Sequence, residues 1–118
     1  MNNKIKIYEI ANPALEMYRE KAKKGSKVSR DVINKKLSAM IYHAETEGEL
    51  LKYKKIYRIF GFFMVVNTRT DKIEVVGWDK DNHGNSNYKR FNRELGKDLE
   101  QTYRLLGLNK SGNNYTIA

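Results

Sequence analysis

The chain has 118 residues, no cysteine and a formal net charge of +9. The lack of cysteine excludes disulfide frameworks, Cys-type zinc fingers, iron–sulfur sites and thiol nucleophiles. The length is typical of one domain, and a hydrophobic content of 40% is enough for a packed core. We therefore expect a single domain over residues 1–118.

The longest apolar run, from Ile59 to Val66, is much shorter than a membrane span. The first residues contain no apolar run suited to a signal peptide. Together with the absence of cysteine, this pattern favours a cytoplasmic protein without a membrane partner.

A short strand and a helix are expected first. Residues 4–10 alternate weakly between polar and apolar side chains, which predicts the strand. Asn12 and Pro13 are a helix-start signal, with Asn12 as the cap and Pro13 in the first turn. This helix should run to about Lys24 and stop at Gly25.

A second helix should begin at Ser29, whose side chain can cap its first turn, and should end at Gly48. Apolar residues at helical spacing define its core face: Ile33, Leu37, Met40, Ile41 and Ala44. His43 lies near this face, where a structural histidine is expected.

Residues 53–66 are rich in β-branched and aromatic side chains, which favour strands. Both faces are apolar from residue 60 to residue 66, which predicts a central strand covered on both sides. Residues 67–71 are typical of a turn, and residues 73–78 would form the returning strand of a hairpin.

A polar loop over residues 79–87 precedes the last helix, which should extend to residue 106 and end at Gly107. Its apolar face is the clearest in the chain: Tyr88, Phe91, Leu95, Leu99, Tyr103 and Leu106. We expect Phe62, Leu95 and Leu99 in the interior. Residues 115–117 would add a short edge strand.

The polar loop resembles the start of a calcium-binding loop, with Asp79 and Asp81 at the first and third positions. The resemblance fails at the twelfth position, where Arg90 stands in place of the bidentate Glu that calcium needs. The sequence therefore predicts no metal and no other cofactor.

The order β-α-α-β-β-α predicts a two-layer α+β domain with a central antiparallel hairpin. A small β-barrel with peripheral helices is the alternative, because both faces of the long strand are apolar.

The positive charge is concentrated in residues 1–58, which carry 14 basic and 7 acidic side chains, against 9 and 7 in residues 59–118. Charge of this size attracts polyanions. A first basic group links the two early helices and suits phosphate contacts: Arg19, Lys21, Lys23, Lys24, Lys27, Arg30, Lys35 and Lys36. An ordinary solvated surface explains it as well.

A second group interleaves basic and aromatic residues: Lys52, Tyr53, Lys54, Lys55, Tyr57 and Arg58. Proteins that bind single strands use such a pattern, since the charges follow the backbone and the rings stack on bases. An amphipathic strand whose tyrosines cover the core edge is the alternative. A third group, Lys89, Arg93 and Lys97, recurs every four residues on one face of the last helix, where a solvated face is equally reasonable.

A metal-independent ribonuclease would need a base, an acid and a cation around one phosphate. His83, Glu74 and Arg58 are residues that could supply these groups, although their spacing does not show that they converge. The sequence favours a non-catalytic, regulatory protein that binds nucleic acid, with RNA slightly ahead of DNA. The alternatives are a protein-interaction module or inhibitor of an acidic partner, and a toxin-like ribonuclease.

Overall fold

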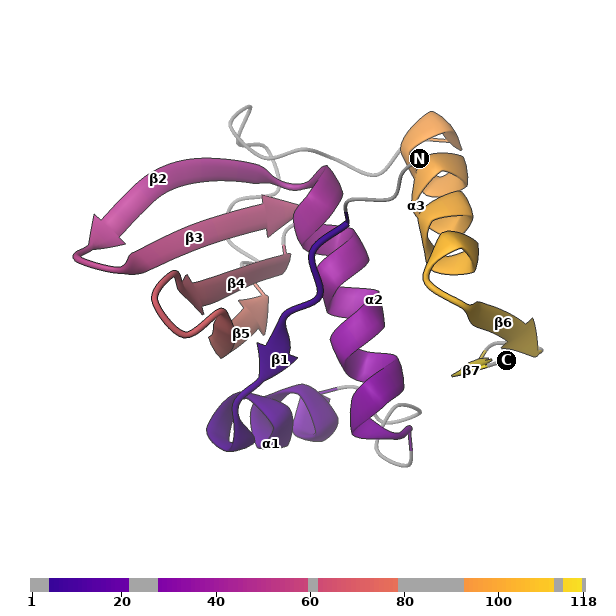
Figure 1. The fold of residues 1–118 in the computed structure, drawn as a ribbon, viewed down its shortest axis with the longest axis horizontal. Helices are drawn as coiled ribbons and strands as arrows, with labels where there is room; N and C mark the ends of the chain where they lie inside the picture. Colours follow the sequence, from indigo (N-terminus) through magenta and orange to yellow (C-terminus); the bar gives the residue numbers. More distant parts are fainter. Residues whose placement is uncertain (1–4, 22–27, 60–61, 79–92, 112–113, 118) are drawn as a thin grey trace.

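The computed structural model describes residues 5–21, 28–59, 62–78, 93–111 and 114–117. The elements in these ranges are β1 (Glu9–Ile10), α1 (Asn12–Lys21), α2 (Arg30–His43), β2 (Glu45–Leu51), β3 (Lys54–Ile59), β4 (Phe62–Asn67), β5 (Lys72–Trp78), α3 (Arg93–Leu105), β6 (Leu108–Ser111) and β7 (Asn114–Ile117). The structure combines helices with a mixed sheet (Figure 1), which confirms the α+β class.

The main sheet has five strands in the order β1-β5-β4-β3-β2. Strand β1 runs parallel to β5, and the other neighbours are antiparallel. Because the described strands form an open sheet with β1 and β2 at its edges, the barrel alternative is wrong. The predicted hairpin, with its turn at residues 67–71 and its return strand at residues 73–78, is present as β4 and β5.

The strand order expected from the sequence needs two corrections. Residues 53–66 contain two antiparallel strands, β3 and β4, paired from Lys54↔Asn67 to Ile59↔Phe62. Residues 45–51 form strand β2 on the edge of β3 instead of the last turns of a helix. Helix α2 ends at His43, before three glutamates whose charge is unfavourable at a helix C-terminus. Pairing with β3 supplies backbone hydrogen bonds that those residues would lack in a fraying helix.

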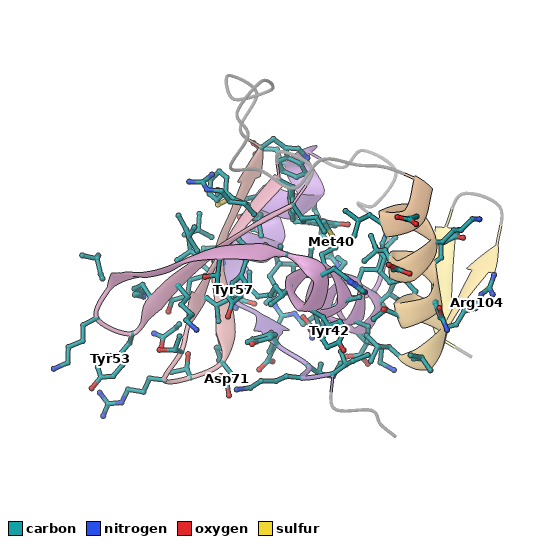
Figure 2. All side chains as sticks on the ribbon, turned by 90° about the horizontal axis from the view of Figure 1, so that it is seen from above. Met40, Tyr42, Tyr53, Tyr57, Asp71 and Arg104 are labelled. Atoms are coloured by element: carbon teal, nitrogen blue, oxygen red, sulfur yellow. The ribbon has the colours of Figure 1, made fainter. Side chains whose placement is uncertain are left out.

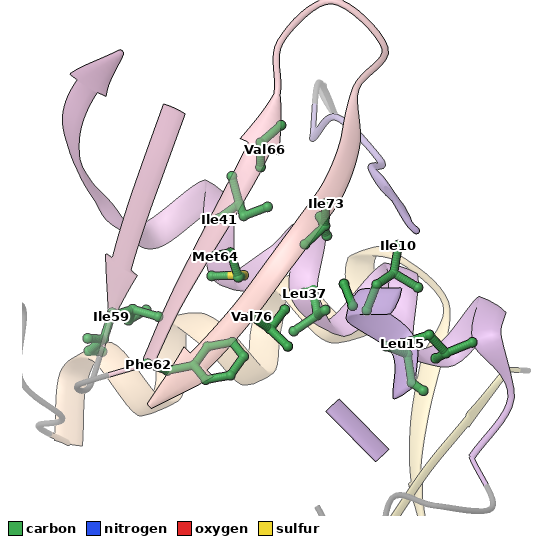
Figure 3. Close-up of a cluster of buried hydrophobic side chains, with 13 residues drawn as sticks. Ile10, Leu15, Leu37, Ile41, Ile59, Phe62, Met64, Val66, Ile73 and Val76 are labelled. Carbon is green, nitrogen blue, oxygen red and sulfur yellow. The ribbon is translucent and has the colours of Figure 1, made fainter. Parts of the chain in front are cut away.

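Helix α2 begins where the sequence predicts. Ser29 is its N-cap, and the Ser29 side chain accepts a 3.3 Å hydrogen bond from the backbone N–H of Val32. On one side of the helix, Ile33, Leu37 and Ile41 pack into the main core against the sheet (Figure 3). This side corresponds to the predicted core face.

The opposite side of α2 packs against α3. Val32 and Ala39 of α2 are buried with Leu99 and Tyr103 of α3 in a second cluster. Helix α2 therefore lies between the sheet and α3 (Figure 1), an arrangement that the expected two layers do not describe. The three interior positions expected from the sequence are confirmed: Phe62, Leu95 and Leu99.

The N-terminal strand is shorter than expected, because only Glu9 and Ile10 pair with β5. Helix α2 supplies further partners for this segment. The side-chain oxygen of Asn34 accepts a 2.8 Å hydrogen bond from the N–H of Ile10, and Ser38 Oγ accepts a 2.7 Å bond from the N–H of Tyr8. Two buried polar side chains thus tie the start of the chain to the central helix.

The C-terminal part contains two expected features and one strand, β6, that was not expected. Gly107 has a φ of +86°, the left-handed conformation expected of a residue that ends a helix. The expected strand over residues 115–117 belongs to β7, which pairs with β6. The proposed loop at 79–87 and the first helical residues, 88–92, lie outside the described residues. Among the described helices, none combines the length and the apolar character needed to cross a membrane.

Candidate nucleic-acid interface

Two turns meet at one end of the main sheet. The β2–β3 turn consists of Lys52 and Tyr53, between the paired residues Leu51 and Lys54. The β4–β5 turn lies beside it, and its Thr68 N–H donates a 2.8 Å hydrogen bond to the carbonyl oxygen of Tyr53. We refer to Lys52, Tyr53 and Arg69, which lie on these two turns, as the turn cluster.

Tyr53 has an unusual backbone conformation for a large side chain. Its φ is +66°, in the left-handed region where two-residue hairpin turns normally place Gly, Asn or Asp. Residues held in this region cost on the order of 1–3 kcal/mol and are often found at functional sites. The side chain is 39% exposed at the tip of the hairpin (Figure 2), so burial of the ring does not account for this choice of residue.

Two cations lie next to the Tyr53 ring. The Lys52 ammonium is 5.4 Å from the ring centre, and the guanidinium carbon of Arg69 is 5.3 Å from it. Asn67 holds the turn that carries Arg69, since its side-chain oxygen accepts hydrogen bonds from the N–H groups of Arg69 (2.9 Å) and Thr70 (3.1 Å). The cluster therefore combines an exposed ring with positive charge from two different turns.

The remaining residues of the second basic group divide between the two faces of the sheet. Lys55 stands opposite Val66, a core residue, whereas Arg58 stands opposite Phe63 on the other face. Lys54 forms an ion pair with Glu74. The expected basic and aromatic stretch thus does not form one continuous surface.

Glu74 is held as a carboxylate. Hydrogen bonds from Lys54, and from Asn67 Nδ2 at 3.1 Å, lower the pKa of Glu74 below its usual value of 4.5. A carboxylate stabilised in this way is a weak base, which makes Glu74 a poor candidate for proton abstraction in a ribonuclease.

A pH-dependent contribution to stability follows from this pKa. Because the pKa of folded Glu74 is lowered, its contribution is present above about pH 4.5 and is lost as the pH falls through the folded-state pKa. Glu74→Gln should therefore lower the urea midpoint of unfolding at about pH 7, and by less at about pH 3. An equal loss at both pH values would show that the charge of Glu74 makes no such contribution.

Described members of the first basic group contribute to the structure near the start of α2. Arg19 Nη2 donates a 2.8 Å hydrogen bond to the carbonyl oxygen of Val28, and Arg30 bonds to the side chain of Asn12. Burial lowers the pKa of Lys36. The side chain of Lys21 and the residues Lys23, Lys24 and Lys27 lie outside the described part of the chain.

The third basic group is far from the turn cluster. Lys97 is exposed on α3, between the exposed residues Glu94 and Asp98. Figure 2 places Tyr53 and Arg104 of α3 at opposite ends of the molecule. Lys89 and the side chain of Arg93 lie outside the part of the chain that the structure describes.

The candidate ribonuclease residues are not brought together in the described structure. Glu74 lies beside Lys54, and Arg58 follows four residues further along β3, about 14 Å at the usual strand rise. His83 lies outside the described residues. His43 Nε2 bonds to Thr102 Oγ1 at 2.7 Å, in agreement with a structural role. The described residues contain no group of three or more metal-ligating side chains.

Sequence reasoning missed Arg69, which lies sixteen positions from Tyr53 in the chain. The isolated Gly61 inside the apolar run was the available signal, since a glycine within a strand pattern often marks an interruption. Dividing the run there places the start of β3 beside the end of β4 and brings the two turns together.

No family model matches this chain, and comparisons with curated proteins and with solved structures also found no match.

Proposed function

We propose that this protein binds single-stranded nucleic acid, with RNA preferred over DNA, and that the turn cluster is a principal contact site. The role proposed is regulatory and non-catalytic. A cytoplasmic location is also proposed, because a chain without cysteine suits a reducing compartment.

The observation that carries this proposal is the exposed Tyr53 ring with two cations within 5.4 Å of its centre. An exposed ring can stack on any base, because every base has a π-face, and neighbouring Lys and Arg side chains can contact the phosphates. The left-handed backbone at Tyr53 supports a functional role, since Asn or Gly would fit this turn with less strain.

Single strands fit this arrangement better than duplexes. A base must leave its stack to lie on a protein ring, and loops or unpaired strands allow this at little cost. RNA is preferred in the proposal because sequence-specific RNA recognition uses aromatic and arginine stacking on unpaired bases.

Tyr53→Ala should weaken binding of a labelled single-stranded RNA by about tenfold, the effect of losing one stacked base. Fluorescence anisotropy at fixed salt measures this affinity, with single-stranded DNA and duplex RNA as competitors. Tyr53→Phe keeps the ring and should bind like the wild type. Tyr42→Ala is the matched control, because Tyr42 is an exposed tyrosine at the end of α2, away from the turns.

The contribution of the cations in the turn cluster is tested by a second variant with its own matched control. Arg69→Ala should reduce the slope of log K against log salt by about 0.7, as expected for one lost phosphate contact to a single strand. Arg104→Ala removes an exposed arginine from α3 and should leave the slope unchanged. If the wild type binds no RNA or DNA at low salt, the proposal is wrong, and recognition of an acidic protein becomes the better account of the charge.

A further inference from the structure

In the described part of the chain, the helices pack against one face of the main sheet. In an antiparallel pair, residues directly opposite one another place their side chains on the same face. Phe62, Met64 and Val66 of β4 point to the face that packs against the helices. The alternate residues Phe63 and Val65 therefore point to the opposite face, which we call the outer face.

The packing of the core supports this division. Residues of α1, α2 and α3 share one buried cluster with the strands. The residues that β3, β4 and β5 contribute to this cluster all lie on the face of the sheet that packs against the helices. Ile56 is 8% exposed and yet belongs to neither buried cluster, because it stands opposite Val65 on the outer face. Val65 and Val75, both half-buried, thus form an apolar strip on two neighbouring strands, next to the buried Ile56.

Phe63 lies flat across the outer face. A Cβ atom at Gly77, its partner on β5, would be 2.6 Å from Phe63 Cζ, so the ring occupies the space above the glycine. Arg58 stands opposite Phe63 on β3, with its guanidinium carbon 5.7 Å from the ring centre. A second ring with a neighbouring cation therefore lies beyond the apolar strip from Tyr53.

We propose that the nucleic-acid site continues from Tyr53 across the outer face to Phe63, so that the ligand is a short single strand with bases on both rings. This inference rests on the function proposed above. The apolar strip would contact the bases and sugars between the two rings. Charge complementarity selects a polyanion as the occupant, since two cations, Lys52 and Arg69, lie at the Tyr53 end of the site.

The groups that carry the contact differ between the two ends of the site. Glu74, an acidic residue of this face, is paired with Lys54. At the other end, the Arg58 guanidinium carbon lies 5.7 Å from the centre of the Phe63 ring, and the proposal assigns the base contact there to the ring.

The separation of the rings sets the length of the ligand. Tyr53 lies five residues before Arg58, the partner of Phe63, which corresponds to about 17 Å along β3. A stacked strand advances about 3.4 Å per nucleotide, so about five stacked nucleotides, or fewer if extended, connect the two rings. Affinity should therefore rise with length up to about this size.

The test compares labelled uridine dinucleotides and hexanucleotides in anisotropy titrations with wild type, Phe63→Leu, Phe63→Tyr and Tyr53→Ala. Phe63→Leu should weaken hexamer binding by about tenfold and leave dinucleotide binding unchanged. Phe63→Tyr keeps the ring and should restore hexamer binding. Ultraviolet cross-linking of the wild type to the hexamer, read by mass spectrometry, should modify peptides that contain Tyr53 and Phe63 but not the peptide with Tyr42, and needs no variant to fold.

The outcomes separate the two proposals. If Tyr53→Ala weakens hexamer binding but Phe63→Leu does not, and no cross-link reaches Phe63, the continuous site is wrong and the turn cluster stands alone. If neither oligonucleotide binds the wild type, the proposed function fails, and the extended site fails with it.

Discussion

Leu37→Ala should lower the free energy of unfolding by about 2–5 kcal/mol, a large part of the stability of a domain of this size. Leu37 is fully buried at the middle of α2, in the cluster that joins this helix to the sheet. Removal of its side chain leaves a cavity in contact with strands and helices that cannot all close around it. Urea unfolding followed by circular dichroism measures the loss.

Leu105→Ala is the matched control for this prediction. It is the same substitution in a helix, but Leu105 is 70% exposed on α3. We expect a change below about 0.5 kcal/mol, as is usual for surface positions. Similar losses for the two variants would mean that α2 does not pack on the sheet as described.

The sequence predicts local features of this fold well, because a few neighbouring residues determine them. Ser29 caps α2 through a bond to a backbone N–H three residues later, and Gly107 supplies the left-handed residue after α3. Residues 67–71 form the expected turn, in which the Asn67 side chain accepts bonds from two following N–H groups. Each of these signals lies within a few residues of the structure it specifies.

Features that depend on distant residues were predicted less well. The sequence of β2, Glu-Thr-Glu-Gly-Glu-Leu-Leu, contains residues that disfavour strands, and pairing with β3 overrides this preference. The expected strand over residues 53–66 is apolar throughout because it combines the end of one strand with the start of its neighbour. Periodicity alone does not separate two such strands.

The same distinction applies to the candidate site. Tyr53 and its neighbour Lys52 are adjacent in the chain, so their pairing was visible in the sequence. Arg69 joins them only through the pairing of β3 with β4. Arg19 and Arg30 looked equally available for phosphate, but tertiary contacts with Val28 and Asn12 give them structural partners that composition does not reveal. A charge cluster in a sequence therefore identifies candidates, and the fold decides which of them are presented together.

Asn34 and Ser38 show how strongly the fold can reassign polar residues. They are one turn apart on α2 and would be expected to face water, yet both are buried. Each accepts a hydrogen bond from the backbone of the N-terminal segment, at Ile10 and Tyr8. A helix face that binds a strand through side-chain oxygens has no periodic signature, since the acceptors match individual backbone groups of a distant segment.

Asn34→Ala should lower the free energy of unfolding by about 1–3 kcal/mol, because it leaves the buried N–H of Ile10 without its acceptor. The Ile10 amide should also exchange with solvent faster in native-state hydrogen exchange, which reports the docking of β1 directly. Ser38→Ala should act in the same direction, and the double variant should lose less than the sum of the single losses, since both bonds hold one segment. Gln101→Ala, at an exposed polar position of α3, is the control and should change stability by less than about 0.5 kcal/mol. Unchanged protection of the Ile10 amide in Asn34→Ala would show that pairing with β5 alone holds the N-terminal strand in place.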